Sequence, residues 1–383
     1  MTEARASRRV LATAAAAGAL TLALGVCVAA LGRGAWPRPW TSPFLAWDAH
    51  HYVSIAREGY RASGPGAEEI VWPPLWPAIL RLVALVTADL PLASVLAPNL
   101  LFLVAAFWLY RLARLDHPPA VAERAVWLLA AAPTAYFFHL GYSESLYLAT
   151  ALPAFYYARL GRWPEASVCG FLAAATRLNG WLILPALAVE AARRPSSARA
   201  VPEAPIAERG ARGSFSQGCE LARAWPLLLI AFGVMPHLAI NESLFGNPLH
   251  FLEVQKTFFR KSLSFPWTGL FGAFEGLASQ PAHEWILTCL AEAAAGVGLA
   301  VFAIHAFRTQ RASYAVYAAL NALFVTSTGF WCSLPRYALA VFPLFLAAAS
   351  WARTERRLRL LIGAGVCLQS AGLALFALGS WAF

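Results

Sequence analysis

The densest group of reactive side chains lies in one short segment, FLAWDAHHYVSIAREGY. An upstream Ser-Pro pair supplies an N-cap and a proline at the first position, so we expect a helix that begins there. In such a helix Asp48, His51 and Tyr52 stand at i, i+3 and i+4 and share one face, which gives Asp48 a hydrogen-bond partner in His51. Trp47 would half-bury this carboxylate, and a carboxylate so placed can act as a general base. The alternative is that Asp48 only complements the dipole of its own helix.

The composition indicates that these residues are positioned by membrane helices. Hydrophobic residues make up 59% of the 383 residues and charged residues 13%, with a mean hydropathy of +0.56. A soluble domain is nearer half apolar and a quarter charged. The net charge of +10 comes from arginines clustered between apolar runs, which is typical of membrane topology and argues against nucleic-acid binding. The six cysteines form no metal-ligand spacing, so we predict neither a disulfide framework nor a cysteine metal site.

The apolar runs predict an all-α polytopic protein, because the backbone polar groups of a lipid-exposed segment must be satisfied internally. The first run is too long for the core of a cleaved signal peptide, so we expect it to be retained as a span. The predicted spans, about eleven in number, are Val10–Leu31, Leu92–Tyr110, Val121–His139, Ser143–Ala158, Glu165–Arg177, Gly180–Ala192, Trp225–Ser243, Glu284–Phe307, Ala312–Thr328, Tyr337–Trp351 and Leu360–Trp381.

The arginines support this topology. With the N-terminus inside, the eleven spans place the arginine clusters of the connecting loops on the cytoplasmic side. These clusters are Arg5, Arg8 and Arg9; Arg111, Arg114 and Arg124; Arg159 and Arg162; Arg193, Arg194, Arg199, Arg209, Arg212 and Arg223; Arg308 and Arg311; and Arg353, Arg356, Arg357 and Arg359. Residues 165–192 could form either one long helix or two short helices broken at Asn179-Gly180.

We therefore expect a single integral membrane domain over residues 1–383 with three long loops. The first external loop, 32–91, holds the reactive segment and an apolar helix at Val71–Leu85 that lies in the interface, where Arg81 would snorkel. The second external loop, 244–283, is basic and aromatic, with Lys256, Arg260 and Lys261 among phenylalanines. The cytoplasmic loop 193–224 is rich in Pro, Ser and Arg and is predicted to be disordered.

The reactive segment resembles the first luminal loop of PIG-V-type mannosyltransferases, which add the second mannose in GPI-anchor assembly and have bacterial relatives. The shared pattern is WDAxH(Y/F)xxIAxxGY, followed by an aromatic-Pro-x-aromatic-Pro element. In this chain it comprises Trp47, Asp48, Ala49, His51, Tyr52, Ile55, Ala56, Gly59 and Tyr60, then Trp72-Pro73-Pro74-Leu75-Trp76-Pro77. The resemblance continues at Tyr142-Ser143-Glu144-Ser145-Leu146, at Thr176-Arg177-Leu178-Asn179-Gly180, and at Arg336-Tyr337 before Val341-Phe342-Pro343-Leu344-Phe345.

Two departures from the family pattern leave the acceptor open. Ala46 replaces the usual basic residue before Trp47, and Trp72-Pro73-Pro74 replaces Phe-Phe-Pro.

The resemblance implies a GT-C fold with interfacial helices and a catalytic carboxylate in the first external loop. It implies an inverting glycosyltransferase, mannosyltransferase-like, that takes a sugar from a polyprenyl- or dolichyl-phosphate carrier. The partners would be this lipid-linked donor, membrane lipids and a glycan, glycolipid or protein acceptor, without nucleic acid. No cofactor is predicted, and a divalent cation stays open because no DxD motif is present.

The implied reaction assigns roles to particular side chains. Asp48 is the expected base, with His51 beside it. Arg177 and Arg336, each near the external end of a span, are candidates to bind the departing phosphate. They could instead pair with a carboxylate such as Glu144. Groups that could bind the sugar are Trp47, Tyr52, Tyr142, Glu144 and Asn179.

Two adjacent carboxylates, Glu68 and Glu69, follow the reactive segment. They could serve a metal or the acceptor, and the alternative is that both are solvated loop charges.

Two rival functions are also compatible with a polytopic membrane protein. A transporter or flippase would show internal repeats and polar residues near mid-membrane in corresponding spans, and the sequence shows neither. The second rival is an enzyme of the same architecture that uses a non-mannose lipid-linked donor, and the sequence does not distinguish it from a mannosyltransferase. Few lysines with many alanines and arginines indicate a bacterial protein, so we expect a cytoplasmic-membrane enzyme with its active site on the external face.

Overall fold

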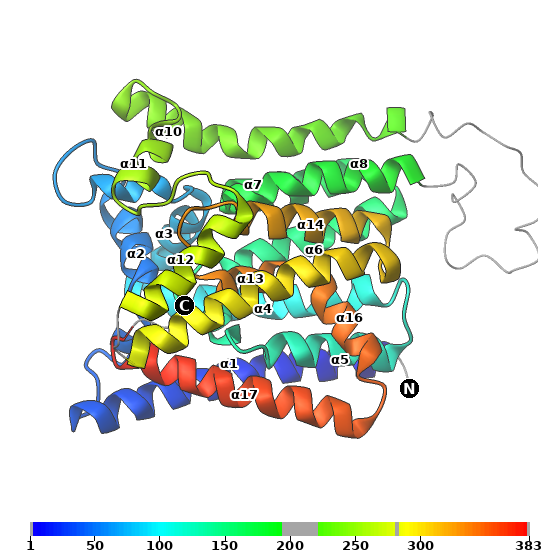
Figure 1. Ribbon diagram of the computed structural model, residues 1–383, viewed down its shortest axis with the longest axis horizontal. Coiled ribbons are helices and arrows are strands. Elements are labelled where there is room, and N and C mark those ends of the chain that lie inside the picture. Colours follow the sequence, from blue (N-terminus) through cyan, green and yellow to red (C-terminus); the bar gives the residue numbers. More distant parts are fainter. Residues whose placement is uncertain (1–2, 194–220, 280–282, 381–383) are drawn as a thin grey trace, which may run out of the picture.

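The computed structural model describes residues 3–193, 221–279 and 283–380, and this part of the chain is built from helices without a strand. The long helices lie side by side along one direction (Figure 1). The α-helices are α1 (Glu3–Arg33), α2 (Asp48–Glu58), α3 (Leu75–Thr87), α4 (Leu90–Ala113), α5 (Pro119–Ala130), α6 (Glu144–Leu160), α7 (Trp163–Thr176), α8 (Ile183–Arg193), α10 (Met235–Phe245), α11 (His250–Thr257), α12 (Pro266–Ser279), α13 (His283–Thr309), α14 (Ala312–Thr326), α15 (Leu334–Tyr337), α16 (Pro343–Trp351) and α17 (Glu355–Ala377). Short 3-10 helices are η1 (Ser42–Phe44), η2 (Ala67–Val71), η3 (Ala135–His139), η4 (Leu178–Leu182), η6 (Trp225–Val234) and η7 (Ala338–Ala340).

Several of these helices are long and apolar enough to cross a membrane, so the chain is an all-α polytopic membrane protein. Within the described ranges five pass on length and composition: Arg5–Arg33, Leu90–Ala113, Trp225–Phe245, Thr288–Thr309 and Glu355–Ala377. A sixth candidate joins Leu334–Ala340 to Pro343–Trp351 across a bend of 85°. The count of eleven stays a prediction, since the other expected spans form shorter helices.

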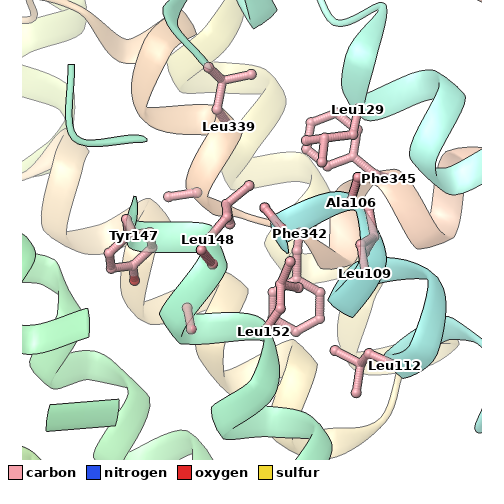
Figure 2. Close-up of a cluster of buried hydrophobic side chains, with 14 of the residues drawn as sticks. Ala106, Leu109, Leu112, Leu129, Tyr147, Leu148, Leu152, Leu339, Phe342 and Phe345 are labelled. Carbon is pink, nitrogen blue, oxygen red and sulfur yellow. The ribbon is translucent and has the colours of Figure 1, made fainter. Parts of the chain in front are cut away.

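Helix α6 lies at the centre of the molecule. Almost every residue of α6 is buried, and α6 packs between α4 and α7. Figure 2 shows the hydrophobic cluster that joins α4, α5 and α6 to the segment from η7 to α16. Its labelled members are Ala106, Leu109, Leu112, Leu129, Tyr147, Leu148, Leu152, Leu339, Phe342 and Phe345. This packing brings a segment near residue 340 against the first half of the chain.

Ion pairs at the two ends of α6 settle the open question at residues 165–192. Glu144, in the first turn of α6, pairs with Arg177, whereas Arg159 in its last turn pairs with Glu190 of α8 at 3.5 Å. Residues 177 and 190 therefore lie at opposite ends of the bundle. The chain turns back at η4, so α7 and α8 are two separate, oppositely directed helices.

The two long predicted external loops lie at the same end of the molecule. Helices α2 and α3 of the first loop are found at one end of the bundle together with α11 of the second, and the N-terminus lies at the other end (Figure 1). The predicted interfacial segment forms α3, which buries Trp76 and Leu80 and exposes Leu82, Leu85 and Val86. The predicted disorder of 193–224 falls almost entirely on 194–220, which lie outside the described residues.

Candidate active site

Asp48 is the first residue of α2, not a residue of its second turn as we expected. The upstream Ser-Pro pair forms only the 3-10 turn η1, and the chain then leaves helical geometry. Trp47 precedes α2 with φ 57° and ψ −129°, a conformation that costs a non-glycine residue of order 1–3 kcal/mol. Strain of this kind clusters at functional sites, and here it sets the direction in which Asp48 enters the helix.

Four charged side chains form a row at this end of the bundle. Asp48 Oδ2 accepts a hydrogen bond from Arg336 at 2.8 Å, and Arg336 Nε lies 3.4 Å from Glu144 Oε1. Arg177 donates to the same Glu144 oxygen at 2.5 Å. The side chains of Arg336 and Glu144 are buried, whereas that of Asp48 is 23% exposed. Buried charges require partners, and this alternation supplies one to each.

Arg336 also lies against three aromatic rings. Its guanidinium carbon is 5.3 Å from the ring centroid of Phe137, 5.1 Å from that of Tyr142 and 5.3 Å from that of Tyr337. Such contacts stabilise a cation that has left water. The hydroxyl of Tyr142 donates to the carbonyl of Ala46 at 3.3 Å, so this tyrosine links Arg336 to the segment that leads into α2.

Tyr52 and Ser143 connect α2 to the other end of the charged row. Tyr52 Oη is 3.3 Å from Ser143 Oγ, which also accepts a hydrogen bond from Arg177 at 3.4 Å. Burial, with a further contribution from the Asp48 carboxylate, raises the pKa of Tyr52 well above its ordinary value. The phenol therefore stays neutral and can donate a hydrogen bond at any physiological pH.

The expected pairing of His51 with Asp48 is wrong. His51 Nδ1 lies 3.2 Å from Glu69 Oε1, and Ser54 Oγ donates to Glu69 Oε2 at 3.0 Å. The His51 ring stacks on Trp72 with centroids 4.5 Å apart. Glu69 is only 3% exposed, so it is no solvated loop charge. The prediction failed because it considered only partners within the same helix, whereas Glu69 comes from η2.

Glu68 and Asn179 lie apart from the charged row. Glu68 accepts from the backbone N–H of Gly66 at 3.0 Å. Asn179 is buried in η4 and donates to Asn321 at 2.8 Å. Asn179 therefore ties the turn that follows Arg177 to α14.

A groove of about 390 Å³ opens beside α2. Polar and charged side chains dominate its lining, and the His51–Glu69 pair forms part of its wall. The lining residues are Leu45, His50, His51, Val53, Ser54, Arg57, Glu58, Arg61, Pro65, Gly66, Glu68, Glu69 and Pro91. His51 is three residues after Asp48, so the groove reaches within one helical turn of that carboxylate.

The first half of the chain has a match among known protein families. Residues 27–189 match the family model described as Mannosyltransferase (PIG-V). This match supports assigning the chain to that family. The chain is a membrane glycosyltransferase. Comparisons with curated proteins and with solved structures gave no match.

The family match covers only part of the charged row. Asp48, Glu144 and Arg177 lie within the matched residues, whereas Arg336 lies beyond them. The structure nevertheless places Arg336 between the two carboxylates. The fold thus completes the row with a residue from the C-terminal part of the glycosyltransferase.

Glu292 is a site residue that the sequence analysis missed. Its buried carboxylate accepts hydrogen bonds from the backbone N–H groups of Ser333 and Leu334 at 2.6 and 2.8 Å. These residues begin α15, which carries Arg336, so Glu292 fixes the start of that helix. A carboxylate within the predicted span Glu284–Phe307 was the available signal, because such residues are costly in a membrane.

Lys261 was noted as a basic loop residue but not as a residue of the active site. Its ammonium nitrogen lies 5.5 Å from the ring centroid of Tyr337, the same ring that Arg177 and Arg336 contact. No sequence spacing relates Lys261 to the family motifs, so only the fold could reveal this position. As for metals, no group of three His, Cys, Asp or Glu side chains in the described ranges could hold an ion.

Proposed function

We propose that this glycosyltransferase is an inverting mannosyltransferase that uses a polyprenyl-phosphate mannose donor, with Asp48 as the general base. The observation that carries the proposal is the partial exposure of Asp48, 23%, at the outer end of a charged row whose other side chains are at most 13% exposed. Among the described residues, Arg336 holds the carboxylate through Oδ2, which leaves Oδ1 to face an incoming hydroxyl group.

The proposed reaction is a single displacement at C1 of the sugar. Asp48 accepts the proton of the acceptor hydroxyl as that oxygen attacks C1. The bond between C1 and the phosphate oxygen breaks, and its electron pair leaves with the lipid phosphate. Attack from the face opposite the leaving group inverts the anomeric centre. General base catalysis of this kind increases the reaction rate by about 10²–10⁴-fold.

Arg177 and Arg336 would meet the negative charge that develops on the leaving phosphate. Both lie within the charged row, and the turn at η4 directs Arg177 toward Glu144. Glu144 Oε2 is buried and has no hydrogen-bond partner among the described residues. It could therefore accept a hydroxyl group of the bound sugar.

The groove beside α2 is the route that we propose for the acceptor. Its polar lining suits a hydroxyl-rich head group, and the His51–Glu69 pair brings that group within one turn of Asp48. Its volume of about 390 Å³ falls in the range of small-molecule sites.

The arginine distribution supports an external position for this end of the molecule. A donor panel tests the proposal as a whole. Membranes carrying the wild-type protein would be incubated with labelled mannose, glucose or pentose on the same polyprenyl phosphate. We expect transfer from the mannose donor and an inverted linkage in the product. Transfer from another donor alone would contradict the mannose assignment, and a retained linkage would contradict the single displacement.

A further inference from the structure

The charged row is already neutral before any substrate binds. It contains two guanidinium groups, Arg177 and Arg336, and two carboxylates, Asp48 and Glu144, each within ion-pair distance of a neighbour. A lipid phosphate that binds to this row adds negative charge to a region where every cation is shared with a carboxylate. Stabilising the leaving group therefore requires further positive charge nearby.

Lys261 supplies a further positive charge that forms no ion pair with a carboxylate among the described residues. Its ammonium faces the Tyr337 ring at 5.5 Å, and the guanidinium carbons of Arg177 and Arg336 each lie 5.3 Å from the centroid of that ring. Three cations thus surround one tyrosine. Among the described residues, no carboxylate oxygen lies within 4 Å of the Lys261 ammonium, in contrast to both arginines.

The segment that carries Lys261 is held in place from two sides. Ser264 N–H donates to the Ser327 carbonyl at 3.1 Å, and Gly329 N–H donates to the Ser262 carbonyl at 3.0 Å. These bonds join residues 262–264 to the loop that leads to Arg336. On the other side, Phe259 packs edge-on against Trp72, the ring on which His51 stacks. Lys261 is therefore positioned by the fold between both parts of the active site.

The surroundings of Lys261 also suit a hydrocarbon chain. Leu263 is 91% exposed, and Phe258, Phe265 and Trp267 are each more than half exposed. Apolar side chains that project from a membrane protein beside a cation provide contacts for both parts of a lipid phosphate, its charged head and its tail.

We propose that Lys261 binds the phosphate of the prenyl carrier, while the exposed apolar side chains beside it contact the first part of the prenyl chain. The assignment rests on the proposed function, because it takes the lipid-phosphate donor as given. When the bond between C1 and the phosphate oxygen breaks, the electron pair moves onto the phosphate, and the ammonium stabilises the charge that results.

Binding of the short product analogue farnesyl phosphate tests this assignment without requiring turnover. Purified full-length protein in nanodiscs would be titrated with farnesyl phosphate, with farnesol and with inorganic phosphate. The variant is Lys261→Gln, and Lys256→Gln in α11 is the control, because it removes the same charge from the same external loop. Lys261→Arg tests whether a positive charge alone restores binding.

We expect Lys261→Gln to weaken farnesyl phosphate binding by about 10–100-fold, the usual effect of losing a hydrogen bond to a charged group. Binding should be unchanged in Lys256→Gln and largely retained in Lys261→Arg. Farnesol should bind equally weakly to all forms, and equal thermal unfolding temperatures would show that the variants remain folded.

Three results would overturn the assignment. Equal affinity of wild type and Lys261→Gln for farnesyl phosphate would remove Lys261 from the phosphate site and leave the proposed function intact. Failure of the wild type to bind farnesyl phosphate would remove the lipid-phosphate donor and this inference together. Inorganic phosphate binding as tightly as farnesyl phosphate would contradict the contact with the prenyl chain.

Discussion

Asp48 and Arg336 are 288 residues apart in the chain, yet they form the ion pair at the outer end of the charged row. The sequence predicted both residues as parts of the active site, from the family motif and from the cost of an arginine at a span end. It did not predict that they contact each other, because no local spacing encodes a contact between the first loop and α15. The pair arises from the packing of α4 and α6 against the segment around Phe342.

Glu69 is a second residue whose contacts could not be predicted from the sequence. From its place in the loop it could be read as a solvated charge, but the fold buries it against His51 and Ser54. The apolar run that begins immediately after it, Ile-Val-Trp, was a signal of burial that the prediction did not use.

We predict that Glu69→Gln lowers the transfer rate by about 10–100-fold, because it removes one charged hydrogen bond that orients His51. The measurement is kcat and KM for sugar transfer. Glu253→Gln in α11 is the matched control, because its carboxylate also pairs with a histidine, His250, but does not line the groove. Equal losses in both variants would show that His51 orientation is not the cause.

Among the elements, the turn at η4 contributes most to the site. It reverses the chain between α7 and α8 and presents Arg177 to Glu144. The sequence indicated a break at Asn179-Gly180 but could not decide between one helix and two. Gly180 is required for close contact: a Cβ at this position would lie 2.4 Å from the Ala173 carbonyl oxygen.

We predict that Gly180→Ala destabilises the protein by about 1–3 kcal/mol and lowers activity, since the clash with α7 must displace the turn that carries Arg177. Thermal unfolding in detergent and transfer rates would measure the two effects. Gly363→Ala in α17 is the control, because a Cβ there meets no atom within 4 Å. It should be neutral or stabilising by up to about 1 kcal/mol. A Gly180→Ala protein as stable and active as this control would contradict the proposed role of the turn.

At the scale of the whole molecule, composition was sufficient to predict an all-helical membrane protein, but length alone is a poor guide to its spans. Five or six candidates are long and apolar in the described ranges. Other predicted spans, such as those at α5, α6 and α8, are short because they pack against protein rather than lipid and are interrupted by turns that form the active site. The eleven-span topology therefore depends on the arginine pattern and not on helix length.

This topology predicts that residues at the two ends of the bundle label from opposite sides of the membrane. In a variant without the six native cysteines, Ser63→Cys in the first loop should react with an impermeant maleimide in intact cells. Arg356→Cys at the start of α17 should react only after permeabilisation. The reverse pattern would place the active site on the cytoplasmic side and remove the basis for an external acceptor.

The central claim is that Asp48 is the general base, and one comparison tests it most directly. Transfer of labelled mannose from polyprenyl-phosphate mannose would be measured with membranes that carry the wild type, Asp48→Asn or Asp89→Asn at matched expression. Asp89 caps α4 through a hydrogen bond that asparagine can also accept, so Asp89→Asn should stay within a few-fold of wild type. We predict that Asp48→Asn lowers the transfer rate by about 10²–10⁴-fold while the protein remains folded. An Asp48→Asn enzyme that transfers mannose at the rate of the Asp89→Asn control would contradict the account.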